Sequence, residues 1–321
     1  MLGAIKGVPA VLSGEMRDTV QLNPVAVYGL EKFFGKEDRA EIMRAMPGIS
    51  SMLPKGGEAI WGNLTWAPDD DPGMGDTFGS TLKYALKNGT TAPMNMSVTD
   101  SLKYLLDTSD DWYRNQIAQN YSHGVAWTRK EIEAFSPTPA WRGVVFELMN
   151  SKENEHNPSK WINPLESRLP LAPNLKIYCF YGVGKPTERS YYIRPVDDAT
   201  SKLRVVIDSA INGFGSDHGV ILGEGDGTVP ILSLGYMCTK GWKISRYNPA
   251  GAKIKTVELA HEPGRFDIRG GPTTADHVDI LGRPDLNELI LRVVAGKGEE
   301  IEEVVHSDIR GISERVPIYE E

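Results

Sequence analysis

The stretch Val220-Ile-Leu-Gly-Glu-Gly-Asp-Gly-Thr-Val-Pro230 combines a short apolar run, a glycine-rich turn and a proline that can start a helix. The pattern predicts a strand over 220–222, a tight turn over 223–227 and a helix from Pro230. Asp226 therefore lies at the carboxyl end of a strand, the edge at which open α/β sheets carry their ligands and catalytic groups. Its glycine neighbours allow a sharp turn that brings the carboxylate inward. A turn without chemistry is the simpler interpretation, and the two acids of the loop do not follow the ligand pattern of a calcium loop.

The sequence around this stretch, residues 173–321, favours α/β structure. Runs rich in β-forming residues cover 175–181, 203–207 and 254–259, and the apolar residues of 285–294 recur at helical spacing. Strands that alternate with helices favour a mainly parallel sheet.

His277 stands 51 residues after Asp226, in an expected loop before a C-terminal helix. A catalytic triad on an α/β sheet runs in the order serine, acid, histidine. The acid orients the imidazole, and the imidazole takes the proton of the serine hydroxyl. Their order in the sequence and their expected positions together favour Asp226 and His277 as acid and base. Taken alone, an aspartate in a glycine-rich loop is more often part of a plain turn, and a single loop histidine is more often a surface residue. His261 and His218 are weaker candidates for the base.

No candidate for the nucleophile occurs among the 321 residues. Its signature, G-x-S-x-G, is absent from the sequence. Cys179 lies in an expected strand and Cys238 in an expected helix, so neither stands on a strained turn. We therefore expect the serine and at least one N–H donor of the oxyanion hole upstream of Met1. The glycine-rich run 182–187 is no phosphate loop, because Pro186 stands where Ser or Thr is required.

The first 172 residues have a different pattern. Helices are expected from Asn23-Pro24 onward and over 37–46, 99–106, 110–120 and 130–135. The stretch 61–172 is otherwise irregular, and five tryptophans lie between residues 61 and 141. We expect this stretch to form a cap or lid; the alternative is that the tryptophans only fill a core.

The composition excludes several classes of protein. With 321 residues, 40% hydrophobic and 24% charged, the chain is typical of a globular protein. A formal net charge of −8 and the lack of a basic run disfavour nucleic-acid binding. The sequence has no run of about 18 apolar residues, so it predicts no membrane-spanning helix.

Several short blocks carry a resemblance to a known family. They are Gly7-Val-Pro9, Leu12–Asp18, Ser51–Gly57, Ile60–Gly62, Asn163–Glu166, Ile177–Gly184, Pro186–Arg189, Gly225–Pro230, Gly235–Cys238 and His277–Gly282. Together they resemble the C-terminal part of the lecithin:cholesterol acyltransferase family. The resemblance implies that Asp226 and His277 are the triad acid and base. It also implies an α/β-hydrolase fold, present here as its C-terminal part, with an irregular, partly helical cap and a mobile lid.

The resemblance further implies an O-acyltransferase of lipid metabolism. In the branch most similar to this chain, the acyl donor is a phospholipid, the acceptor is diacylglycerol and the product is triacylglycerol, without a metal or other cofactor. Two alternatives stay open: a phospholipase or other lipid hydrolase with the same triad, and a non-catalytic chain that only binds lipid or pairs with another subunit. A membrane surface is the expected partner of the complete enzyme.

The resemblance also pairs Cys179 with Cys238 in a disulfide, which would close a loop of about 60 residues and stabilise the fold by about 4 kcal/mol. Two buried thiols are the alternative. Asn-x-Ser/Thr triplets occur at Asn63, Asn88, Asn95 and Asn120. Disulfide and triplets favour the lumenal side of the endoplasmic reticulum.

We expect residues 1–321 to be part of one such domain. Within it, 61–172 is the candidate cap or lid, and 173–321 carries the triad acid and base. The apolar start at Met1 favours a truncated product of a membrane-anchored parent protein, and without its serine the isolated chain is expected to be inactive.

Overall fold

The computed structural model describes residues 1–21, 24–73, 75–85, 94–123, 154, 156–213, 215–264 and 270–318. The chain divides into two compact units. One consists of 1–2, 126–187 and 223–321 and is called the C-terminal unit; the other consists of 3–125 and 188–222 and is called the N-terminal unit. Each unit is described by itself.

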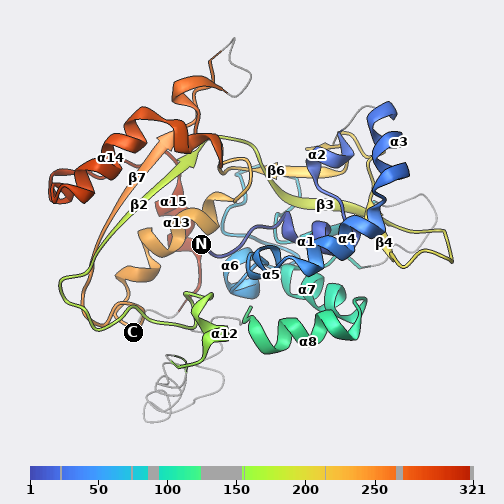
Figure 1. Ribbon diagram of the computed structural model, residues 1–321, viewed down its shortest axis with the longest axis horizontal. Coiled ribbons are helices and arrows are strands. Elements are labelled where there is room, and N and C mark those ends of the chain that lie inside the picture. The colour runs from blue at the N-terminus through green and yellow to red at the C-terminus, as the bar shows by residue number, and fades with distance from the viewer. Residues whose placement is uncertain are drawn as a thin grey trace. The chain divides into compact units, whose positions relative to one another are not determined.

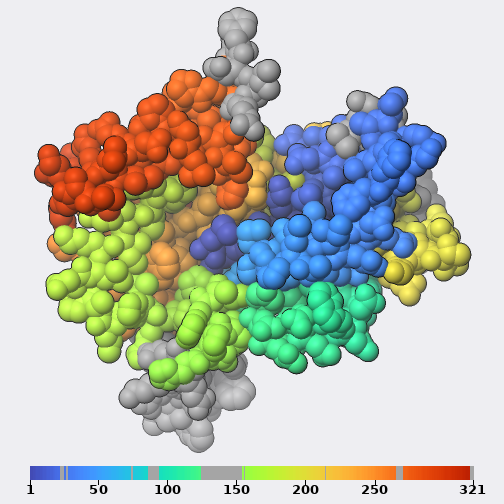
Figure 2. All heavy atoms as spheres, viewed as in Figure 1, coloured from blue at the N-terminus to red at the C-terminus, as the bar shows by residue number. Residues whose placement is uncertain are grey.

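The C-terminal unit is built on two parallel strands, β2 (Lys176–Val183) and β7 (Lys253–Ala260) (Figure 1). Successive side chains of a strand point to opposite faces, so the pair has two surfaces to cover. Val257 and Leu259 share one apolar cluster with Ala275, Ile280, Leu286 and Ile301, and Tyr178 and Phe180 pack against it. This face is covered by η3 (Asp279–Gly282) and α14 (Pro284–Val294), and α14 forms part of the outer surface in Figure 2.

The other face of the two strands carries α13 (Ile231–Thr239), and α15 (Ile309–Arg315) packs on α13. Gly235 of α13 allows this close packing, because a Cβ there would lie 2.4 Å from Ile309 and 2.7 Å from the Tyr181 hydroxyl. The Tyr181 hydroxyl donates to the buried Glu258 carboxylate at 3.0 Å. Among its described residues this unit also has the short helices α12 (Pro158–Trp161), η1 (Gly241–Lys243), η2 (Gly271–Thr273) and η4 (Gly298–Glu300).

The N-terminal unit contains a second sheet with the strand order β1-β3-β6-β5, and β4 also pairs with β3. β1 runs parallel to β3, whereas the pairs β3–β4 and β5–β6 are antiparallel. The strands are β1 (Leu82–Tyr84), β3 (Thr187–Pro195), β4 (Val205–Ile207), β5 (Ser216–Asp217) and β6 (Val220–Gly223). β6 thus ends where the glycine-rich turn before α13 begins.

Helices make up the rest of the regular structure of the N-terminal unit in the described residues. They are α1 (Gly7–Ser13), α2 (Arg17–Val20), α3 (Pro24–Phe33), α4 (Lys36–Ala45), α5 (Pro47–Ser51), α6 (Gly57–Trp61), α7 (Val98–Asp107) and α8 (Asp111–Asn120). Every residue of α1 is buried, and α1 packs on α4 and β4. α3 has the opposite character, since Val25, Tyr28 and Phe33 are exposed on it. None of the helices in the described ranges has the length and apolar content needed to cross a membrane.

A buried arginine ties the irregular stretch after α6 to the sheet. The guanidinium of Arg189 in β3 donates to both carboxylate oxygens of Asp69 at 2.8 Å. It also donates to the carbonyl oxygens of Trp61 and Phe78 and stacks on both rings. These hydrogen bonds and the paired carboxylate offset the cost of burying the charge of Arg189. Trp61 is a core residue of this unit, Trp112 is exposed, and Trp127 and Trp141 lie outside the described residues.

Within the described residues, the expected helices and strands are found with bounds shifted by one or two residues. The helix expected over 37–46 ends at Ala45, and Pro47 begins the next helix, α5, as its first residue. The strands β1, β3 and β5 and several short helices were not expected. In the part of the chain that the structure describes, the strands form two sheets rather than one mainly parallel sheet, because β3 leaves β2 after a three-residue connection and pairs with the antiparallel β4. The helix expected over 130–135 lies outside the described residues.

Candidate active site

Asp226 lies in the turn between β6 and α13, within the C-terminal unit. Its Oδ1 accepts hydrogen bonds from the backbone N–H groups of Thr228 at 3.0 Å and Val229 at 2.8 Å. Gly227 has φ +91°, a left-handed conformation that side chains rarely adopt. The turn therefore holds the carboxylate in one orientation, and only 5% of the side chain is exposed.

His277 meets this carboxylate from a second segment of the same unit. Its Nδ1 lies 2.7 Å from Asp226 Oδ2, and its backbone N–H donates to the Asp226 carbonyl oxygen at 2.9 Å. The imidazole is 36% exposed. The buried acid and the partly open histidine are the arrangement in which a carboxylate fixes the tautomer with Nδ1 protonated and leaves proton transfer to Nε2. The structure thus brings together the two residues that the sequence order paired.

The His277 segment approaches β2 closely because of one glycine. A Cβ at Gly182 would lie 2.1 Å from the carbonyl oxygen of Ala275, closer than any side chain allows. The connection after β2 also contacts the Asp226 turn, since the Lys185 N–H donates to the Gly225 carbonyl oxygen at 2.9 Å. The site is therefore a junction of three backbone segments.

The two weaker histidine candidates lie in other settings. His261 follows β7, and its Nδ1 accepts the backbone N–H of Ala275 at 3.0 Å, so this nitrogen supports the loop. Burial and the nearby Lys185 lower the pKa of His261. His218 belongs to the N-terminal unit and pairs at 2.7 Å with Asp217, its own neighbour in the sequence. That pair is exposed, with 44% of Asp217 and 45% of His218 accessible.

Cys179 and Cys238 form a disulfide that joins β2 to α13. The bond spans 59 positions of the sequence, with the two Cα atoms 6.4 Å apart. α13 is the helix that directly follows the Asp226 turn, and β2 directly precedes the Lys185 connection. The bridge thus ties together two of the three segments of the site.

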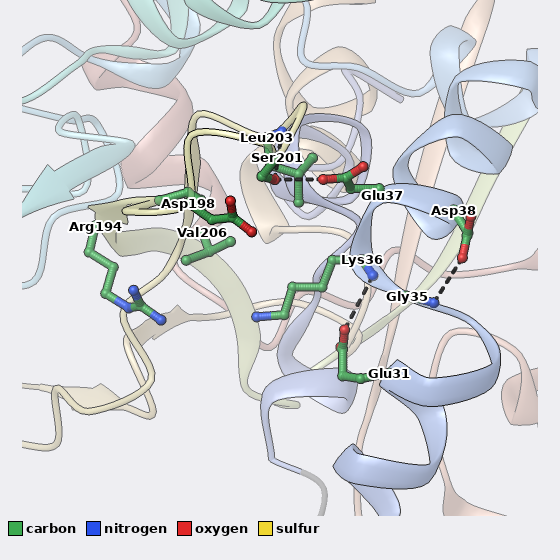
Figure 3. A pocket seen from close by; sticks show the side chains of 11 residues that line it. Glu31, Gly35, Lys36, Glu37, Asp38, Arg194, Asp198, Ser201, Leu203 and Val206 are labelled. Carbon is green, nitrogen blue, oxygen red and sulfur yellow. Dashed lines mark hydrogen bonds between the residues drawn. The ribbon is translucent and has the colours of Figure 1, made fainter.

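Two pockets are lined by residues other than the pair. A pocket of about 450 Å³ in the N-terminal unit is lined by the acidic residues Glu31, Glu37, Asp38 and Asp198 together with Lys36 and Arg194 (Figure 3). Another, of about 490 Å³, lies between β7 and α14. Neither includes Asp226 or His277. Within the described ranges, no three His, Cys, Asp or Glu side chains are grouped so that they could hold a metal ion.

Two charged residues at this junction were not predicted from the sequence. The sequence pattern singles out neither Lys185 nor Asp276. Their side chains form an ion pair across 91 residues of sequence. The one available signal was the placement of an acid directly before the candidate base.

Comparison with known proteins identifies the family. The family model described as lecithin:cholesterol acyltransferase matches residues 1–284. The phospholipid:diacylglycerol acyltransferase of Schizosaccharomyces pombe is 46% identical over 97% of this chain and 46% of its own length. The protein of the same name from Saccharomyces cerevisiae is 40% identical over 94% of this chain and 42% of its own length. Phospholipid:diacylglycerol acyltransferase 1 of Arabidopsis thaliana is 30% identical over 99% of this chain and 56% of its own length. This chain thus spans about half the length of the curated relatives it matches, and it belongs to the lecithin:cholesterol acyltransferase family.

Proposed function

We propose that this chain carries the acid and base of a serine-dependent acyltransferase that moves an acyl chain from a phospholipid to diacylglycerol. The observation that carries the proposal is the 2.7 Å contact between His277 Nδ1 and the buried Asp226 carboxylate. The names of the relatives support the choice of donor and acceptor.

The proposed reaction has two halves. In the first, His277 Nε2 takes the proton of a serine hydroxyl as the serine oxygen attacks the phospholipid ester. The ester bond breaks, the imidazolium returns the proton to the leaving lysophospholipid, and an acyl-serine remains. In the second, His277 deprotonates the diacylglycerol hydroxyl, which attacks the acyl-serine. Triacylglycerol leaves, the serine regains the proton, and Asp226 stabilises the imidazolium in both halves.

The proposed reaction requires a serine nucleophile that the sequence of this chain does not supply. G-x-S-x-G does not occur in the 321 residues. We therefore assign the serine and the first oxyanion-hole donor to protein sequence outside this chain, before it in the order serine, acid, histidine.

The proposal includes the fold of the site. The parallel pair β2–β7, the acid loop before α13 and the base loop before α14 support the C-terminal part of an α/β-hydrolase fold. Residues 61–172 are the proposed cap or lid, and 173–321 the part that carries acid and base. A cap would exclude water and so favour transfer of the acyl chain to diacylglycerol over hydrolysis of the acyl-serine.

We also place the protein on the lumenal side of the endoplasmic reticulum, at a membrane surface. The disulfide supports an oxidising compartment. Of the four Asn-x-Ser/Thr triplets, Asn63 and Asn120 are exposed, Asn95 is half-buried and accepts the Tyr84 N–H, and Asn88 lies outside the described residues. Exposed triplets are accessible to lumenal glycosylation.

The test uses the full-length protein with phospholipid labelled in its acyl chain and unlabelled diacylglycerol. We expect label in triacylglycerol, and we expect His277→Gln to remove it, with His218→Gln as the matched control that retains it. Label in free fatty acid alone would support the lipid hydrolase instead. Label in neither product, with the wild-type protein folded, would favour the non-catalytic chain.

A further inference from the structure

The connection between β2 and β3 contacts both loops of the candidate active site. Lys185 donates its backbone N–H to the Gly225 carbonyl oxygen at 2.9 Å, and it forms a parallel bridge with Asp226. Two residues on, the Thr187 hydroxyl accepts the Gly227 N–H at 2.8 Å and donates to the Lys185 carbonyl oxygen at 2.8 Å. The connection thus holds the acid turn on both sides of Asp226.

The side chain of Lys185 reaches the other loop, where it forms an ion pair with Asp276, the residue before His277. The pair is partly buried, with 33% of Lys185 and 24% of Asp276 exposed. Asp276 Oδ1 also accepts the Val278 N–H at 3.2 Å, on the far side of His277. Burial alone would raise the pKa of Asp276, but the ion pair and the backbone N–H groups outweigh it and lower the pKa below its ordinary value.

We propose that Lys185 and Asp276 are positioning residues for His277: their ion pair fixes the histidine segment against the Asp226 turn and balances the charge beside the imidazole. The inference deepens the proposed function and rests on it for the role of His277. Neither residue needs to touch the substrate. Each acts through the histidine, by geometry and by charge.

Each substitution is expected to shift the pKa of His277 in a definite direction. Within the described residues, the charged and titratable groups of the three segments and of the loop after β7 are Lys185, Glu224, Asp226, His261, Glu262, Asp276, Asp279 and Arg283. Removing Asp276 leaves the Lys185 ammonium without its carboxylate near the imidazole, which disfavours imidazolium and lowers the pKa of His277. Removing Lys185 leaves the Asp276 carboxylate uncompensated, which favours imidazolium and raises the pKa of His277.

The first experiment measures the pKa of His277 by NMR titration of its ring signal in the 321-residue chain, assigned by its loss in His277→Gln. We expect Asp276→Asn to lower this pKa by about 0.5 and Lys185→Met to raise it by about 0.5. The double variant should fall between them. Lys185→Arg, which keeps the charge, should restore the wild-type value.

Matched controls and the folding of each variant keep the experiment decisive. Lys176→Met and Glu299→Gln remove a surface ion pair of the same unit, 2.7 Å long, that does not contact the site, and they should leave the pKa of His277 unchanged. Retention of the Cys179–Cys238 bridge and of the wild-type near-ultraviolet circular dichroism shows that a variant is folded. Shifts of the same sign in Asp276→Asn and Lys185→Met, or no shift in either, would overturn the inference.

The second experiment measures the pH dependence of kcat/KM for triacylglycerol formation in the full-length protein. Its lower limb should move in the same direction as the NMR titration, since it reports the essential base. If the NMR values shift with opposite signs but the pH profile does not move, the ion pair still tunes His277, and it is the catalytic role of His277 in the proposed function that fails.

Discussion

Two Asp–His pairs in this protein have the same contact distance and different surroundings. In both, a histidine Nδ1 lies 2.7 Å from an aspartate oxygen. Asp226 is 5% exposed and receives two backbone N–H groups, and its histidine comes from 51 residues away. Asp217 is 44% exposed, and its histidine is the next residue. The contact distance therefore does not distinguish the two pairs; the burial of the acid and the groups that hold it do.

The partners of the two acids explain the difference. Asp217 also accepts a hydrogen bond from Gln21 and lies 3.6 Å from Arg17, so its carboxylate is shared among flexible side chains in water. The hydrogen bond from His218 lowers the pKa of Asp217, but solvent screens such an exposed pair. Asp226 is held by backbone instead, and backbone donors cannot turn away.

The largest expected effect separates the two acids by activity. Asp226→Asn should lower turnover about 10⁴-fold in the full-length protein, because the amide no longer fixes the imidazole tautomer. Asp217→Asn should leave turnover within about twofold, since an exposed surface pair contributes little. Triacylglycerol formation, normalised to folded protein, is the measurement. Equal losses in the two variants would remove the distinction on which the assignment of the site rests.

The next effect concerns the stability of the region around each pair. Both cysteines of the chain belong to the C-terminal unit. Replacing Cys179 and Cys238 by serine should lower the free energy of unfolding by about 4 kcal/mol, because the bridge closes a loop of about 60 residues.

Hydrogen exchange locates this loss. Amides of β2 and α13 should lose protection in the double serine variant, whereas those of the β5–β6 hairpin beside His218 should keep it. Uniform loss across both units would mean that the bridge stabilises the chain as a whole and not the region of the Asp226–His277 pair.

The pair at the site could be predicted from sequence because its signals are local. The apolar run 220–222, the glycine-rich turn and a histidine before an amphipathic helix each occupy a few residues. β3 could not be predicted, because its first half is Thr-Glu-Arg-Ser and reads as polar. Those side chains are buried all the same, and Arg189 finds its carboxylate 120 residues away in Asp69.

The Lys185–Asp276 ion pair could not be predicted either, because its two residues are 91 positions apart in the sequence. A buried polar residue is stable only with its partner, and single-sequence patterns carry no record of distant partners. The division of the strands between two sheets is likewise a matter of long-range pairing, which periodicity does not encode.

The smallest expected effect compares one glycine near each pair. Gly182→Ala places a Cβ 2.1 Å from the Ala275 carbonyl oxygen, so the segment that carries His277 must move away from β2. A displacement of about 1 Å in a catalytic group costs roughly 10²-fold in rate, and we expect a loss of that size in triacylglycerol formation. Gly213→Ala, beside the His218 hairpin, meets no atom within 4 Å and only strains a backbone at φ +99°.

Gly213→Ala should therefore cost about 1 kcal/mol of stability and leave the activity of the folded fraction unchanged. The two variants separate backbone strain at a positive φ, which only Gly213→Ala introduces, from displacement of the base, which only Gly182→Ala produces. If the activity per folded molecule fell equally in both, the close approach of β2 to Ala275 would not position His277. The rigid junction of three segments would then be a feature of the fold and not of the chemistry.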